Sequence, residues 1–86
     1  MEEIIRNNIK MAMGEEGLKK AEIVAARAAI IASHDDDVDM SSLIIGLWVG
    51  NDGEMPETLQ YMALGMVSGL AQLQMRKIND TEMELR

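Results

Sequence analysis

The stretch ETLQYMALGMVSGLAQLQMRKI, residues 57–78, decides the fold, because it is the longest segment of the chain with a regular apolar pattern. Its apolar residues recur at spacings of three and four, which is typical of an α-helix. At about 100° per residue they cover well over half of the helix circumference, so this helix needs more than one neighbour. They form two stripes, Leu59, Met62, Met66, Leu70 and Leu73 on one and Leu64, Val67, Ala71, Met75 and Ile78 on the other.

The bulk composition predicts one small domain that gains stability by association. A chain of 86 residues buries a modest core and usually needs disulfides, metals or oligomerisation in addition. It has no cysteine, which excludes disulfides and thiolate metal sites and favours a reducing, cytoplasmic setting. We therefore expect a homo-oligomer.

The net charge of −7 limits the possible partners. It repels nucleic-acid phosphates and anionic membranes, so we expect neither as a partner, and it favours docking onto a basic protein surface. The uncharged run at 58–75 is close to membrane-spanning length, but its polar residues would be costly in hydrocarbon. A buried helix is the better interpretation of this run.

The first third of the chain carries two helical patterns with two glycines between them. A short helix is expected at 2–13 and an alanine-rich helix at 15–33. Gly14 can cap the first helix, and a continuous helix would hold both Gly14 and Gly17 at about 1 kcal/mol each. A break is favoured, while one kinked helix over 2–33 is the alternative.

The middle and the end of the chain are predicted from turn and cap signals. The run at 40–49 suits a strand or a helix, and the lack of a pairing strand favours a short helix. Residues 50–53, GNDG, predict a turn, and Pro56 belongs in the first turn of the last helix. Residues 79–86 form a polar tail that either frays or adds a helical turn.

Together these elements predict an all-α fold, a single helical domain over 1–86. It is a small bundle of three to four helices, in which the long helices 15–33 and 57–78 pack antiparallel and oligomerisation completes the core.

The sequence offers no catalytic residue, cofactor or metal site that we can name. Asp35, Asp36, Asp37 and Asp39 resemble the start of a calcium loop, but Met40 and Gly46 stand where that loop needs Gly and Glu. A solvated, helix-capping loop explains them better. His34 has no nucleophile to serve and suits a helix C-terminus.

The last helix carries the residues that we consider first for binding. Tyr61, Ser68, Gln72 and Arg76 lie on the arc between the apolar stripes and could line a polar pocket between subunits. The predicted subunit interface comprises Gly65, Gly69, Leu59, Met62, Met66, Leu70, Leu73 and Trp48. Each group also has an ordinary alternative. The polar residues could be a solvent face, the glycines could serve close helix packing, and the tryptophan could fill the core.

These patterns predict a non-enzymatic, acidic interaction module that binds a protein partner. By analogy of composition alone, accessory or inhibitor-type proteins of phages and mobile elements are of this kind. The alternative is a homo-oligomer that binds a small polar, nucleotide-like ligand at a subunit interface. An enzyme is the third hypothesis.

Overall fold

The computed structural model of the chain describes residues 1–52 and 54–84, and all of its regular structure is helical. The elements are α1 (Glu2–Ser33), α2 (Met40–Asp52), the π-helical η1 (Leu59–Ala63) and α3 (Leu64–Glu84). No strand occurs in the described ranges, which confirms the small all-α bundle and the helix, rather than strand, at 40–49.

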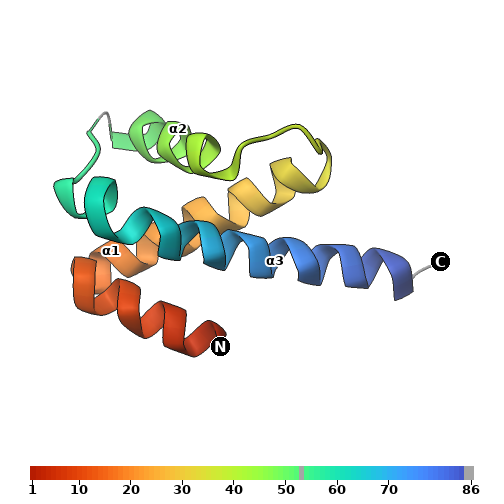
Figure 1. The fold of residues 1–86 in the computed structure, drawn as a ribbon, viewed down its shortest axis with the longest axis horizontal. Coiled ribbons are helices and arrows are strands. Elements are labelled where there is room, and N and C mark those ends of the chain that lie inside the picture. Colours follow the sequence, from red (N-terminus) through yellow and green to blue (C-terminus); the bar gives the residue numbers. More distant parts are fainter. Residues whose placement is uncertain (53, 85–86) are drawn as a thin grey trace.

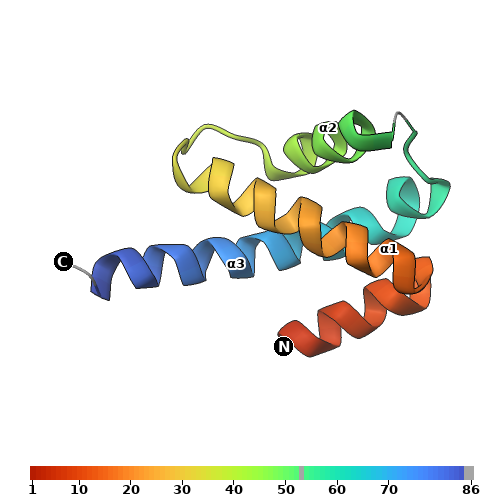
Figure 2. The same cartoon turned by 180° about the vertical axis from the view of Figure 1, so that it is seen from behind.

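Gly14 divides α1 into two arms that fold back on one another (Figures 1 and 2). Its backbone angles, φ 78° and ψ 178°, belong to a region that essentially only glycine occupies. The N-terminal arm, residues 2–13, and the central arm, residues 15–33, are therefore separate rods. The predicted break is confirmed.

The long helices do not run antiparallel as predicted; the central arm and α3 run in the same direction (Figure 1). Gly17 shares one cavity with Thr58, and Ala32 shares another with Gln72, so the two helices advance together. The reason is that α2 follows the central arm in the sequence and runs in the opposite direction. The chain therefore reverses once before α2 and once after it. The antiparallel neighbour of α3 is the N-terminal arm, whose Glu2 reaches Lys77.

The core lies where the central arm, α2 and α3 meet, and alanines make that meeting close. Small side chains let two helix backbones approach, and the larger residues of α2 and α3 fill the remaining space. The N-terminal arm contributes Ile9 to the same core. Its buried members are Ile9, Ala21, Val24, Ala25, Ala28, Ile44, Trp48, Leu59, Ala63, Val67, Leu70 and Ala71.

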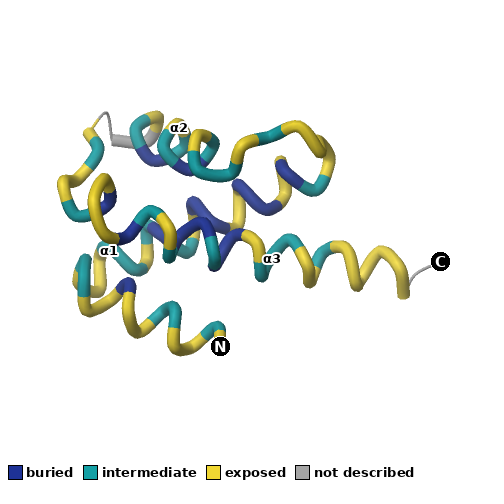
Figure 3. Tube along the Cα trace, viewed as in Figure 1, coloured by how far each residue is buried: buried dark blue, intermediate teal, exposed yellow. Residues whose placement is uncertain are grey.

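The ends of the helices differ from the prediction at two places. The last helix continues to Glu84 instead of ending at Ile78, and its final turns are exposed (Figure 3). Of the turn predicted at 50–53, the first three residues belong to α2, and Gly53 lies outside the described residues. Within the last turns, Thr81 Oγ1 donates a hydrogen bond to the carbonyl oxygen of Lys77.

Candidate binding site

A polar network fixes the N-terminal arm against α3. Lys77 Nζ lies 2.7 Å from Oε2 of Glu2, and Gln74 Nε2 donates to Oε1 of the same carboxylate at 2.8 Å. Arg6 bridges Glu2 at 3.3 Å and Glu22 of the central arm at 2.9 Å. The hydrogen bond from Lys77 lowers the pKa of Glu2 below its ordinary value, and the nearby charge of Arg6 adds to that effect.

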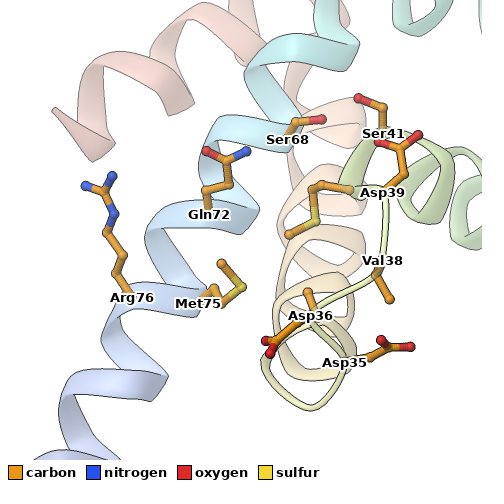
Figure 4. A pocket seen from close by; sticks show the side chains of 11 residues that line it. Asp35, Asp36, Val38, Asp39, Ser41, Ser68, Gln72, Met75 and Arg76 are labelled. Carbon is orange, nitrogen blue, oxygen red and sulfur yellow. The ribbon is translucent and has the colours of Figure 1, made fainter.

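Where α3 passes the loop between α1 and α2, the structure forms a cavity of about 470 Å³, here called the loop cavity (Figure 4). One wall is the stretch of α3 from Ser68 to Arg76, and the other is the acidic loop and the start of α2. Its lining combines carboxylates, hydroxyls and thioethers: Ala32, Asp35, Asp36, Val38, Asp39, Met40, Ser41, Ser68, Gln72, Met75 and Arg76.

Ser68 is the unusual residue of the loop cavity. It is 8% exposed, and its Oγ is buried with no hydrogen-bond partner among the described residues. In Figure 4 its hydroxyl is directed toward Ser41, at the start of α2. An unsatisfied buried hydroxyl costs about 1–3 kcal/mol, so a polar group supplied at this point would be bound favourably.

The aspartates of the loop are arranged by one hydrogen bond inside the loop and one from the first turn of α2. The backbone N–H of Asp37 donates to Asp35 Oδ1 at 3.0 Å, and Ser42 Oγ donates to Asp39 Oδ2 at 2.7 Å. The described part of the chain brings no three metal-ligating side chains together. The loop therefore presents separate carboxylates instead of a ligand cage.

The cavity unites three of the four residues predicted to bind a ligand. Ser68, Gln72 and Arg76 line it, whereas Tyr61 lies on η1, is 76% exposed and takes no part. The opposite wall is formed by the chain's own loop rather than by another subunit. Asp36 and Ser41 also line the cavity, and nothing in their spacing in the sequence predicts that the loop folds over α3.

The residues predicted for a subunit interface separate into two groups. Leu59, Leu70 and Trp48 are buried in the chain's own core. Gly69 faces Ile5 of the N-terminal arm, and a Cβ added at Gly69 would make an ordinary van der Waals contact with it. Those that remain at least partly at the surface are Met62, Gly65, Met66 and Leu73.

Trp48 also borders a second cavity, of about 510 Å³, at the opposite end of the bundle. Lys20 Nζ lies 4.9 Å from the centre of its ring, a cation–π distance. Met13, Met55 and Pro56 are part of its apolar lining. Trp48 therefore belongs to the core and also lines the cavity next to the kink of α1.

Negative charge gathers at the end of the molecule that holds the acidic loop and the C-terminal turns of α3, at the right of Figure 1. We call this the acidic end; its carboxylates are Asp35, Asp36, Asp37, Asp39, Asp80, Glu82 and Glu84. None of them forms an ion pair with a described residue. In contrast, Glu2, Glu15, Glu16 and Glu22 all have basic partners on other surfaces.

Comparison with known proteins adds no assignment: no protein-family model, curated protein or solved structure matches this chain. Among the described helices, none has a stretch both long and apolar enough to cross a bilayer.

Proposed function

We propose that this protein is a non-enzymatic binding module whose acidic end docks onto a basic segment of a protein partner. The observation that carries the proposal is the concentration of seven carboxylates without a described ion-pair partner at one end, whereas four of the five carboxylates of α1 are neutralised by ion pairs, Glu3 being the exception. Such segregation steers a cationic partner to one place and speeds its association.

The helix directions strengthen the field at the acidic end. The central arm and α3 both end there, and a helix C-terminus carries about half a negative charge. Neither helix has a basic residue in its last turn. The N-terminus of α2 beside Asp39 offsets part of this charge. A cationic partner would neutralise the negative charge that remains at this end.

A lysine octapeptide titrated by isothermal calorimetry tests the proposal. Since one exposed ion pair contributes about 0.2–1 kcal/mol, the double variant Asp37→Asn/Glu82→Gln should weaken binding about fivefold. Binding should also weaken when salt rises from about 0.05 to about 0.3 M.

The matched control is Glu54→Gln/Glu57→Gln, which removes the same charge at the opposite end of the bundle. Docking at the acidic end predicts that this control binds the peptide as the unaltered protein does. Equal losses in both double variants would mean that only net charge attracts the peptide, and the proposal would be wrong.

A second candidate, self-association, is favoured by apolar residues on the outside of the central arm. Ile23 and Ile30 are about half exposed and lie seven residues apart, two helical turns on one face, with Ile31 beside them. We propose that this face pairs with a second copy. Sedimentation should show a dimer that Ile30→Glu dissociates; a monomer at micromolar concentration would contradict it.

A further inference from the structure

We propose that the loop cavity is a binding site for an organic cation with N–H donors and a short aliphatic stem, an alkylammonium group. The inference does not depend on the protein partner proposed above, because it rests on the lining of one cavity and not on the charge of the whole acidic end.

The charge of the lining selects a cation. Asp35, Asp36 and Asp39 contribute three carboxylates against the single guanidinium of Arg76 among the described lining residues. In Figure 4 that guanidinium points away from the loop, whereas the carboxylate of Asp36 points toward α3. Asp36 has no hydrogen bond or ion pair with a described residue. An anionic, nucleotide-like ligand would therefore meet net repulsion.

The polar atoms of the lining select a hydrogen-bond donor. Ser68 Oγ is more than nine-tenths buried and lacks a partner, and an ammonium N–H would give it one. Ser41 and Gln72 supply further oxygens around the same space. A hydrogen bond from a charged donor is about twice as strong as one between neutral groups. A quaternary ammonium ion has the charge and no donor, so it would lose this contribution.

The apolar part of the lining selects the stem. Met40, Met75 and Val38 border the carboxylates, and methionine side chains adapt their shape to flexible aliphatic chains. A methylene chain can lie against them with an ammonium end at Ser68 while the chain extends toward Asp36 at the other end of the cavity (Figure 4), as lysine side chains do at protein surfaces. A cavity of about 470 Å³ has room for a ligand of this size.

Titration of the whole protein with putrescine, followed by amide chemical shifts, tests the assignment. We expect saturable shifts at Asp36, Ser68 and Gln72, and affinity at least about tenfold higher than for the butane-1,4-bis(trimethylammonium) ion, which has the same two charges and stem but no N–H donor. Ser68→Ala should abolish that preference for the donor-bearing cation, Asp36→Asn should weaken both ligands, and Glu57→Gln should change neither. Circular dichroism of each variant verifies that the fold is retained.

Three outcomes would overturn the proposal. The butane-1,4-bis(trimethylammonium) ion could bind as tightly as putrescine, the shifts could spread evenly over all acidic residues, or adenosine monophosphate could bind more tightly than either cation. Nα-acetyl-lysine amide distinguishes the two sources of the ligand: higher affinity than putrescine identifies a lysine side chain of a protein, and lower affinity identifies a free diamine. Either result supports the alkylammonium site.

Discussion

Replacing Gly14 by alanine should destabilise this protein, although the same change inside an ordinary helix stabilises. With φ 78° and ψ 178°, Gly14 has a backbone conformation that strains other residues by about 1–3 kcal/mol. In the interior of a continuous helix, alanine would instead be favoured over glycine by about 1 kcal/mol. The sign of the effect therefore reports whether the kink exists in solution.

The variant could escape the strain only by straightening α1, and that route is also unfavourable. It would remove the N-terminal arm from α3, exposing Ile9, whose burial contributes about 2 kcal/mol, and breaking the contacts of Glu2. Either way the free energy of unfolding should fall by about 2 kcal/mol. For a domain of this size that lowers the melting temperature by about 8–16 °C.

Urea denaturation followed by far-UV circular dichroism measures the change, and Gly65→Ala is the matched control. Gly65 is exposed on α3, and a Cβ there would meet nothing within 4 Å, so this change should stabilise by about 0.5–1 kcal/mol. If Gly14→Ala stabilised the protein as much as Gly65→Ala, the kink and the packing of the N-terminal arm would both be refuted.

Further predictions concern the cavity, the Glu2 network and the core. Ser68→Ala should leave the free energy of unfolding unchanged or raise it by up to about 1 kcal/mol, because it removes an unsatisfied hydroxyl; a loss above that would reveal an existing partner. Because the hydrogen bond from Lys77 lowers the pKa of Glu2, the network stabilises fully above the ordinary pKa of 4.5 and is lost as pH falls through the folded value. The stability difference between the unaltered protein and Lys77→Met, measured with urea, should thus shrink from about pH 6 to about pH 3; a constant difference would contradict the ion pair. Leu59→Ala should cost about 2–5 kcal/mol because Leu59 is fully buried, whereas Met62→Ala, at a residue that is 69% exposed, should change stability by less than about 0.5 kcal/mol; similar melting temperatures for the two would argue against the position of η1.

The candidate site could be predicted only on one of its walls. Residues on one helix share a face by periodicity, so Ser68, Gln72 and Arg76 were recognisable as neighbours. Tyr61 was grouped with them on the assumption of regular α-helical geometry. Tyr61 instead lies within the π-helical turn η1, before the stretch of α3 that lines the cavity, and stands apart from it.

Local chemistry in the sequence by itself determined the helices of this protein and the kink between the first two. Spacings of three and four, alanine-rich stretches and a glycine at the break act within a few residues of one another, so they can be read without knowing the fold. The same local signals were too weak to locate the end of α3, because its last turns are exposed and contact little beyond their own helix.

Only the tertiary structure decided the direction of the long helices and what meets at the acidic end. Periodicity is the same for a helix running either way, and the direction follows from α2 returning the chain between the two. That return brings the C-termini of α1 and α3 to one end and places the acidic loop against α3, so that Asp36 and Ser68 line one cavity. Contacts between residues more than 30 positions apart depend on packing of the whole chain, which no local pattern encodes.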